Sequence, residues 1–355
     1  MSTFVADLRL KVLGSGSAMP GPAVDNDTML AALGRHCGRR AERKARAIAH
    51  RLAIHQRHLS RDLDQAEGTL QAGQDAPALC HRALGRALEQ AGGGADRLGY
   101  LVGHTTSPHT LLPPNIAWVA DAMAYQGPYL ELRQACTGFA NALQVAGAFV
   151  NANGMDAVAL VGSENGSVFF SMDEAFVTAG QLVNYMQMGD GAGALVIGPD
   201  DGSGEQLISD MFIGQIGNGV EPGIALDGGG SASPYCDQGL PVFEHRADTV
   251  RQKGHHLFER GLAAVRERGY RLDDFRYIVP HQANGRLGQL LARHLGIPEQ
   301  RFHITADRYG NLGSAAIWVA FDDLRRSGKL AAGDRVLVLG AEASKFLYGG
   351  FIYTH

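Results

Sequence analysis

Short apolar runs that alternate with helical repeats constrain the fold of this chain more than any other feature of its sequence. Continuous short apolar runs are typical of strands that are buried on both faces. They are bounded by Gly, Pro or Asp and lie at Leu98–Val102, Ala157–Val161, Ala194–Ile197, Tyr277–Val279 and Arg335–Leu339. Between them, Leu287, Leu291 and Leu295 repeat at helical spacing, and Gly296 ends that pattern. The alternation predicts an α/β protein with a largely parallel sheet.

Composition and charge exclude several classes of protein. Hydrophobic residues make up 45% of the 355 residues and charged residues 19%, which provides an ample core and excludes intrinsic disorder. The net charge of −4 gives no basic excess of the kind that nucleic-acid binding needs. No apolar run is long enough for a membrane-spanning helix, and Asp7, Arg9 and Lys11 make the start unlike a signal peptide. We therefore expect a cytoplasmic protein with no nucleic-acid or membrane partner.

The chain is interpreted as two similar halves. Tyr129–Arg133 is predicted to be a strand that leads into Cys136 at a helix start, and Tyr277–Val279 leads in the same way into His281. Reactive residue types at equivalent positions suggest an internal duplication. We place the boundary in the polar, glycine-rich stretch 199–206, which predicts an N-terminal half at 1–200 and a C-terminal half at 201–355.

Further glycines and helical repeats define smaller features. Leu8–Leu13 is predicted to be a strand that ends in a glycine turn at 14–16. Gly217–Gly239 is predicted to be a long surface segment, and loops of that length are uncommon without a role. A helix is expected from about Ser314 to Arg326, before Gly328.

Cys136 is the strongest candidate for a reactive residue. The other cysteines, Cys37, Cys80 and Cys236, lie far from it, and no C-x-x-C pair indicates a zinc site or a disulfide framework. Cys136 alone stands between a strand and an apolar helix. Unpaired N–H groups and the positive end of the helix dipole favour a thiolate, so we expect a lowered pKa. The alternative is a small, inert core residue, which is our interpretation of the other three.

His281 and Asn311 are candidates to complete a site around Cys136. His281 follows a strand and Pro280, where α/β proteins place functional residues, although an exposed turn histidine fits the same pattern. Asn311 lies between two glycines, as a turn or a helix cap also would. A thiolate with neutral hydrogen-bond donors suits acyl transfer. The order Cys, His, Asn also fits papain-like proteases, but the residues around Cys136 lack the papain pattern.

Five motifs in the right order resemble those of the β-ketoacyl-acyl-carrier-protein synthase III family, which are condensing enzymes of the thiolase superfamily. The motifs lie at Gly14–Pro20, Ala135–Phe139, Met188–Ala194, Val279–Asn284 and Tyr309–Ala316. The resemblance implies the thiolase fold, a duplicated five-layer α-β-α-β-α arrangement, in a homodimer. It implies no cofactor, with an acyl-CoA or acyl-carrier thioester and malonyl-carrier protein as substrates.

The resemblance also implies a role for each residue of the site. Cys136 takes an acyl group from a thioester, and the backbone N–H groups of Cys136 and Ser344 hold the oxyanion. Malonyl on an acyl carrier protein then loses CO₂, and His281 and Asn311 stabilise the enolate-like charge. The carbanion attacks the acyl-cysteine and gives a 3-oxoacyl product. Asn311 favours the priming class, because elongating synthases carry a second His there.

Substrate-binding residues follow from the same resemblance. Arg51 and Arg286 match the phosphate-contacting arginines of the family, Asn284 is assigned to substrate binding, and Leu112 replaces an aromatic residue of the acyl tunnel. Two departures concern specificity. No Trp lies in 30–60, where the family stacks the adenine of coenzyme A, and the last loop, Glu342–Gly350, is bulkier and more charged than the family's glycine-rich loop. A carrier-bound primer or a specialised pathway therefore becomes more plausible.

A short segment concentrates basic residues. Eight lie within 35–57, namely Arg35, Arg39, Arg40, Arg43, Lys44, Arg46, Arg51 and Arg57. The segment is either a solvated helix face or a docking patch for an acidic carrier protein or a phosphopantetheine phosphate. A docking patch would act by electrostatic steering and would be sensitive to salt.

Three functions remain open on the sequence. The leading hypothesis is decarboxylative condensation with malonyl-carrier protein. The alternative is an acyltransferase or ketosynthase of secondary metabolism, which uses the same Cys136 with a non-malonyl acceptor. A silent subunit of a heterodimer is the third, and the intact set of Cys136, His281 and Asn311 argues against it.

Overall fold

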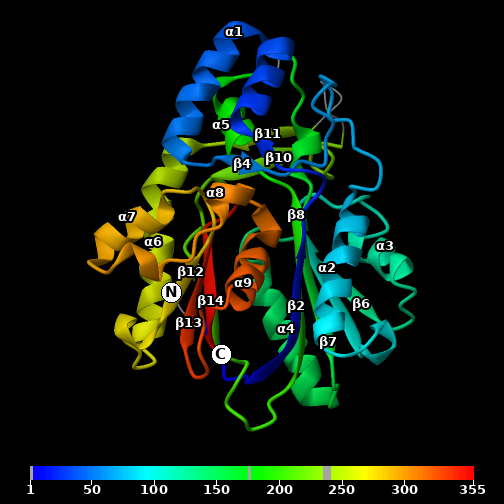
Figure 1. Ribbon diagram of the computed structural model, residues 1–355, viewed down its shortest axis with the longest axis vertical. Coiled ribbons are helices and arrows are strands. Elements are labelled where there is room, and N and C mark those ends of the chain that lie inside the picture. Colours follow the sequence, from blue (N-terminus) through cyan, green and yellow to red (C-terminus); the bar gives the residue numbers. More distant parts are fainter. Residues whose placement is uncertain (1–2, 175–176, 235–240) are drawn as a thin grey trace.

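The computed structural model describes residues 3–174, 177–234 and 241–355. Its main feature is a ten-stranded sheet that is folded into two halves (Figure 1). The N-terminal half runs in the order β6 (Tyr129–Leu132), β5 (Tyr100–Thr105), β7 (Val158–Glu164), β8 (Gly191–Pro199) and β2 (Leu10–Ala18). The C-terminal half runs in the order β9 (Leu207–Gln215), β14 (Leu347–Thr354), β13 (Arg335–Glu342) and β12 (Tyr277–Pro280), with β1 (Phe4–Ala6) paired to β9. Strands β2 and β9 join the halves, and 200–206 forms the turn between β8 and β9.

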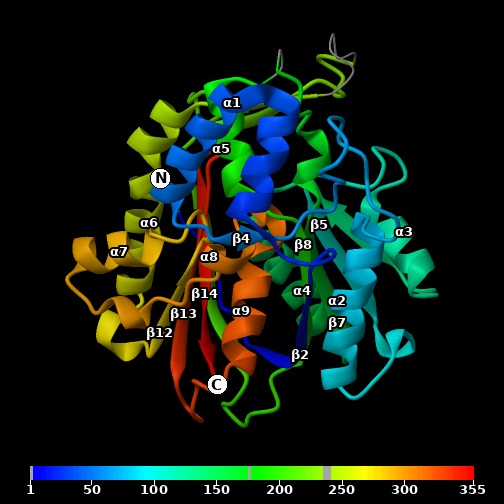
Figure 2. The ribbon, with the colours of Figure 1, turned by 45° about the horizontal axis from the view of Figure 1, so that its top comes forward.

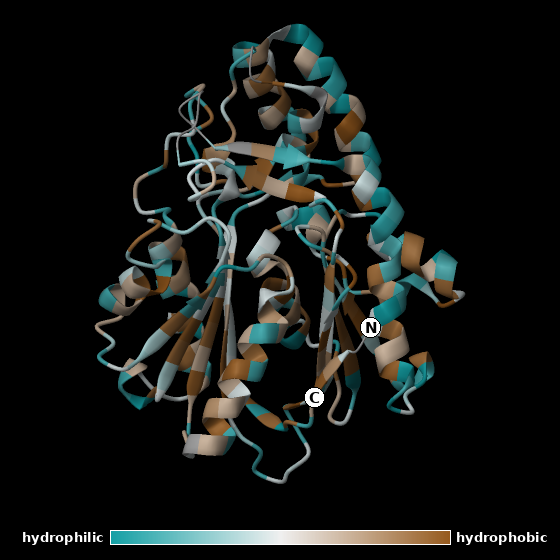
Figure 3. Ribbon diagram, turned by 180° about the vertical axis from the view of Figure 1, so that it is seen from behind, coloured by the Kyte–Doolittle hydropathy of each residue, from teal (hydrophilic) through white to brown (hydrophobic). Residues whose placement is uncertain are grey.

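Helices on both faces of each half make five layers, which confirms the predicted fold class. Helices α4 (Gly138–Asn153) and α9 (Ala316–Arg326) lie between the two halves of the sheet (Figure 1). The N-terminal half is covered on its outer face by α2 (Ala76–Gln90) and α3 (Asn115–Ala122), and the C-terminal half by α6 (Ala247–Arg266) and α7 (Leu287–Leu295). Hydrophobic residues concentrate in the strands (Figure 3).

A cap of helices and short strands lies at one end of the molecule (Figure 2). Helix α1 (Asn26–Leu52) packs its apolar face on α5 (Ala179–Gln187). The short strands pair as β3 (Val24–Asp25) with β4 (Gln56–Arg57) and β10 (Ile224–Asp227) with β11 (Val242–His245). Single turns complete the chain at Ala95–Arg97, Gly166–Phe169, Leu272–Asp274, Glu299–Arg301, α8 (Ala306–Tyr309) and Gly313–Ala315.

Strand registers reveal the internal duplication residue by residue. Tyr100 of β5 is paired with Val158 of β7, and Tyr277 of β12 is paired in the same parallel way with Val336 of β13. Counting along the strands from these pairs matches YLVGH with YIVPH and VALVGSE with VLVLGAE. The two halves therefore share a sequence repeat as well as a topology.

The same register corrects the equivalence that was predicted between Cys136 and His281. The counterpart of His281 is His104 in β5, because β5 and β12 take the same place beside β7 and β13. Strand β6 pairs with β5 at the edge of the N-terminal half. At the same place beside β12, the C-terminal half has an isolated bridge between Ile278 and Phe302. The turn before α4, which carries Cys136, therefore corresponds to the segment before α9, which carries Asn311.

Two glycine-rich segments also differ from their prediction. Gly14 and Gly16 lie inside β2 instead of forming a turn at its end. A Cβ on Gly16 would lie 2.3 Å from the carbonyl oxygen of Ala83 in α2, so the glycines allow this helix to pack closely on the strand. The predicted surface segment 217–239 contains β10, while Cys236 lies outside the described residues.

Candidate active site

The Cys136 turn lies between β6 and α4, as the sequence predicts. Cys136 is partly exposed, whereas Thr137, the residue before α4, is buried. Gly138 is required sterically, because a Cβ there would lie 2.4 Å from Nδ1 of His104. Phe139 packs edge-on against Trp318 of α9, with ring centroids 5.8 Å apart. The nucleophile candidate is thus held by the core on its C-terminal side.

A buried carboxylate from the opposite half of the sheet occupies the start of α4. Glu342 is the last residue of β13, and its Oε2 accepts the backbone N–H of Thr137 at 2.9 Å and the hydroxyl of Thr137 at 2.6 Å. Its Oε1 accepts the hydroxyl of Ser344. The negative charge of Glu342 therefore lies at the positive end of the α4 dipole, beside Cys136.

Burial of the thiol, together with this carboxylate, explains why the predicted lowering of the Cys136 pKa is wrong. The pKa of Cys136 is raised well above its usual value, first because the thiol is desolvated and then because Glu342 and Glu164 place negative charge near it. The helix start that would favour a thiolate stabilises Glu342 instead. The surroundings of Cys136 in the free protein therefore favour the thiol over the thiolate.

His281 follows β12 directly and is held by its backbone. Its N–H donates to the carbonyl oxygen of Leu339 in β13 at 2.7 Å, and only 7% of the residue is exposed. Burial lowers the pKa of His281 to about 4. The imidazole is consequently neutral near pH 7, and no protein hydrogen bond to its ring is found among the described residues.

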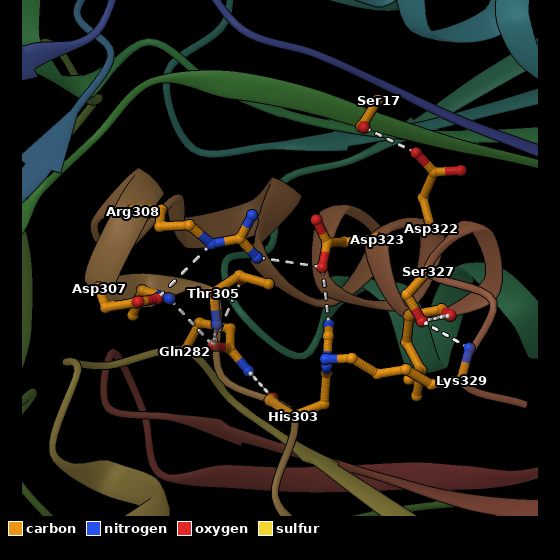
Figure 4. Close-up of polar contacts among 12 residues, drawn as sticks. Ser17, Gln282, His303, Thr305, Asp307, Arg308, Asp322, Asp323, Ser327 and Lys329 are labelled. Carbon is orange, nitrogen blue, oxygen red and sulfur yellow. Dashed lines mark hydrogen bonds and ion pairs between the residues drawn. The ribbon is translucent and has the colours of Figure 1, made fainter.

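Gln282 fixes the segment that carries His281. Its Oε1 accepts the backbone N–H of Thr305 at 2.7 Å, and its Nε2 donates to the carbonyl oxygen of His303 at 3.1 Å (Figure 4). The same Nε2 also donates to the carbonyl oxygen of Pro280 at 2.7 Å. His303 also lines a polar cavity of about 1010 Å³, whose lining does not include Cys136, His281 or Asn311. Gln282 therefore fixes the backbone of the segment that carries His281 and makes no hydrogen bond to the His281 ring.

Asn311 is bound on three sides and leaves its amide nitrogen free. Its N–H donates to Gln187 at 2.8 Å, and its carbonyl accepts the N–H of Gly189 at 3.0 Å. Its Oδ1 accepts the N–H of Gly313 at 3.1 Å, so the side-chain NH₂ is the group left to donate. We find no partner for this NH₂ among the described residues.

A second buried carboxylate holds the segment that follows Asn311. Glu164, the last residue of β7, accepts the backbone N–H of Ser314 at 3.1 Å and its hydroxyl at 2.9 Å. Thr106 and Ser107 donate to the same carboxylate from the end of β5. Burial raises the pKa of Glu164.

These contacts bring the predicted catalytic residues to one end of the sheet. Glu342, three residues beyond Leu339, bonds to Thr137, and Leu339 bonds to the backbone of His281. Glu164 lies close enough to raise the pKa of Cys136 and also bonds to Ser314, near Asn311. Residues that are 145 and 175 positions beyond Cys136 in sequence (281 − 136 and 311 − 136) are thus linked to it by short chains of contacts.

Ser344 lies in the tight turn between β13 and β14, next to this cluster. Its hydroxyl bonds to Glu342, the same carboxylate that holds Thr137. Among the described residues we find no acceptor for the backbone N–H of Ser344 or of Cys136. Both N–H groups predicted to form an oxyanion hole are therefore uncommitted.

The predicted phosphate-binding arginines lie side by side. Arg286 donates from Nε to the carbonyl oxygen of Arg51 at 3.0 Å and from an Nη to that of His50 at 3.1 Å, at the C-terminal end of α1. Asn284 accepts the backbone N–H of Arg286 at 3.0 Å and shapes the turn before α7. The structure thus joins Arg51, Arg286 and Asn284, and it ties Arg286 mainly to backbone.

Leu112 and the basic segment lie on the surface, with one exception. Leu112 is 85% exposed, so its own chain does not enclose it. Most of the basic residues at 35–57 are exposed on or near α1. Arg57 is fully buried and donates to Asn26 at 2.7 Å and to Met186 at 2.9 Å, so it does not belong to a docking surface.

Sequence reasoning missed three residues of this cluster. Glu164 and Glu342 end two copies of one repeat, and His104 is the counterpart of His281. The repeat itself was a signal that could have found them. In the sequence alone, Glu342 stands out only as part of the bulky, charged last loop.

Comparisons with known proteins extend over nearly the whole chain. Residues 130–214 match the family model of 3-oxoacyl-[acyl-carrier-protein] synthase III, and 265–352 match that of its C-terminal part. The chain is 28% identical over 358 residues to β-ketoacyl-[acyl-carrier-protein] synthase III of Xanthomonas oryzae pv. oryzae, covering 97% of this chain and 98% of the relative.

Solved structures agree with this match. The tetronic acid condensing enzyme AbyA1 is 28% identical, with a TM-score of 0.83, and the match covers 98% of this chain and 100% of AbyA1. The priming β-ketosynthase of the R1128 polyketide pathway is 25% identical, with a TM-score of 0.72, and covers 97% of this chain and 96% of its own.

Fold and site together define a condensing enzyme of the thiolase fold. Within this class, the chain resembles the β-ketoacyl-acyl-carrier-protein synthase III enzymes in both family-model matches and in its relatives, and it is an acyltransferase of that type. None of the helices in the described part of the chain has the length and apolarity that a membrane span requires.

Proposed function

We propose that this enzyme condenses an acyl thioester with malonyl-acyl-carrier protein through an acyl-Cys136 intermediate. In the first half-reaction the Cys136 thiol loses its proton and its sulfur attacks the thioester carbonyl. The backbone N–H groups of Cys136 and Ser344 receive the oxyanion of the tetrahedral intermediate. The thiol of coenzyme A or of the carrier then departs and takes up the proton.

In the second half-reaction the acyl group meets a carbon nucleophile. Malonyl thioester loses CO₂, and the electron pair of the broken bond becomes an enolate. The neutral His281, in its Nε2–H tautomer, and the NH₂ of Asn311 donate to the enolate oxygen. The enolate carbon attacks acyl-Cys136, and the sulfur leaves from the 3-oxoacyl product.

The observation that carries this proposal is the set of uncommitted donors around Cys136. His281 is buried and neutral, the Asn311 amide is fixed through its oxygen, and two backbone N–H groups lack acceptors among the described residues. Hydrogen-bond donors that have no protein acceptor and lie at one site suit negative charge that exists only during reaction. No group of this set needs a cofactor.

A second candidate function differs only in the acceptor. It is acyl transfer or condensation in secondary metabolism with a non-malonyl acceptor. The likeness to AbyA1 supports it, as does the charged loop from Glu342 to Lys345 where the family has glycines. An acceptor that does not decarboxylate would still need Cys136 for acyl transfer.

Partners and location complete the proposal. The enzyme works in the cytoplasm with acyl carrier protein, which the exposed arginines of α1 attract. It acts as a homodimer, in which a second copy covers the exposed Leu111 and Leu112. In that arrangement Leu112 reaches the acyl site of the partner subunit, although it lines no site in its own chain.

The test is intact-mass screening of acyl-CoA and acyl-carrier thioesters, followed by addition of malonyl-carrier protein. The proposal expects an acyl adduct that is absent in Cys136→Ala, and CO₂ release with loss of the adduct when malonyl is added. An adduct without CO₂ release selects the second candidate. If no thioester acylates the wild-type protein, both candidates are wrong.

A further inference from the structure

Two buried glutamates cross between the halves of the molecule in the same way. Glu164 and Glu342 are the last residues of the repeats VALVGSE and VLVLGAE, and each is 3% exposed. Glu342, from the C-terminal half, bonds to Thr137 at the start of α4 in the N-terminal half. Glu164, from the N-terminal half, bonds to Ser314 before α9 in the C-terminal half.

The chemistry of the two contacts is also the same. Thr137 and Ser314 each donate both a backbone N–H and a side-chain hydroxyl to one oxygen of the glutamate, over 2.6–3.1 Å. Carboxylates are acceptors with room for several donors, and helix starts favour negative charge. The pair is therefore a repeated structural device and not two unrelated bonds.

Each contact lies next to a residue of the site. Thr137 follows Cys136 directly, and Ser314 comes three residues after Asn311. Glu342 has a further contact, because its other oxygen accepts the hydroxyl of Ser344. One carboxylate thus holds both turns whose backbone N–H groups would form the oxyanion hole.

We propose that Glu342 and Glu164 are positioning residues with separate tasks. Glu342 aligns the Cys136 and Ser344 turns for acylation, and Glu164 aligns the Asn311 segment for the condensation that follows. The division of tasks rests on the proposed function, whereas the placement of Glu342 beside the sulfur does not.

The negative charge of Glu342 gives the proposal a signature that Glu342→Gln separates from loss of folding, because an unfolded chain would alkylate faster but could not be acylated as the wild type is. The charged groups near the Cys136 sulfur are Glu342 and Glu164, while His281 and His104 stay neutral because burial lowers the pKa of each to about 4. Removing the Glu342 charge makes the thiolate easier to form. Removing its hydrogen bonds misaligns the oxyanion donors.

The experiment compares Glu342→Ala with Glu342→Gln in two assays. The first measures alkylation of Cys136 by iodoacetamide from pH 6 to 10, with the modified peptide identified by mass. The second measures acylation of Cys136 by a thioester substrate. Glu342→Ala should alkylate at least ~3-fold faster at pH 7 yet acylate at least ~10-fold more slowly. Glu342→Gln, which keeps the shape, should alkylate faster and acylate within ~3-fold of wild type.

The second part of the experiment replaces Glu164 and compares acylation with condensation. Glu164→Ala should acylate within ~3-fold of wild type but condense at least ~10-fold more slowly, and Glu164→Gln should recover most of the condensation rate. The matched control is Glu89→Ala, because Glu89 is exposed on the outer helix α2 and should change neither assay.

Three outcomes would overturn the proposal. They are unchanged alkylation in both Glu342 variants, wild-type acylation in Glu342→Ala, or the same kinetic profile in the Glu342 and Glu164 variants. If Glu342→Ala does not fold, Ser344→Ala replaces it and should slow acylation while leaving alkylation unchanged. If the wild type accepts no thioester, the proposed function fails, while the alkylation assay still decides the placement of Glu342.

Discussion

His104 and His281 occupy the same position in the two halves of the molecule, yet they differ in what they contact. Burial lowers the pKa of both to about 4, so both rings are neutral near pH 7. Nε2 of His104 accepts the indole N–H of Trp318 at 2.9 Å, whereas the ring of His281 has no protein hydrogen bond among the described residues. The duplicated scaffold thus holds the ring of one histidine by a hydrogen bond and leaves the ring of the other without a protein partner among the described residues.

Replacing His281 should have the largest effect on activity. We expect His281→Ala to slow condensation by about 10²–10³-fold, because a preorganised donor to the enolate is lost. Acylation of Cys136 should persist. The measurement is single-turnover decay of the acyl adduct after malonyl-carrier protein is added. Loss of acylation itself in this variant would contradict the assigned role.

Replacing His104 should affect stability and not primarily the reaction. We expect His104→Ala to lower the free energy of unfolding by about 2–4 kcal/mol, because it opens a cavity and leaves the Trp318 N–H without a partner. Urea denaturation measures this change. Exposed His294 is the matched control, and His294→Ala should stay within about 0.5 kcal/mol of wild type.

The outer helices of the two halves differ in how closely they approach the sheet. A Cβ on Gly16 in β2 would lie 2.3 Å from the backbone oxygen of Ala83, whereas one on Gly261 in α6 would lie 3.1 Å from the mobile end of Leu339. We expect Gly16→Ala to cost about 1–3 kcal/mol and Gly261→Ala to cost less than about 1 kcal/mol. Thermal and urea unfolding of both variants test the difference, and equal costs would contradict it.

The pH dependence of stability should reveal the buried neutral histidines. A histidine whose folded pKa lies below its usual value contributes stability above about pH 6.5 and loses it as the pH falls towards 4. For His281 this amounts to about 1 kcal/mol between pH 7 and 5.5. Urea denaturation at both pH values should show a smaller loss in His281→Ala than in wild type. An equal loss would show that the ring is charged in the folded state.

The sequence predicts much of this molecule because its signals are local. The apolar runs from Ala157 and Arg335 form β7 and β13, and the leucine repeat from Leu287 forms α7. The motifs around Cys136, His281 and Asn311 place these residues after the right elements. Family resemblance then links them across the chain.

The errors arise where a distant residue changes a local expectation. A helix start beside Cys136 predicts a lowered pKa, but burial of the thiol raises the pKa, and Glu342, which is 206 positions away in sequence (342 − 136), raises it further. Gly14 and Gly16 resemble a turn in sequence, and only the close packing of α2 shows why a strand needs them. The residues around Cys136 do not reveal Glu342, and the residues around Gly14 and Gly16 do not reveal α2, because these partners lie far away in the sequence.

The crossed glutamate contacts also bear on how such a chain can be divided. Two separate copies of one half, related by a twofold axis, would form each contact twice, because an isologous interface repeats every interaction. Once both copies are part of one polypeptide, the two contacts no longer have to be identical. The two equivalent turns are then free to diverge, so that one bears the thiol of Cys136 and the other the amide of Asn311.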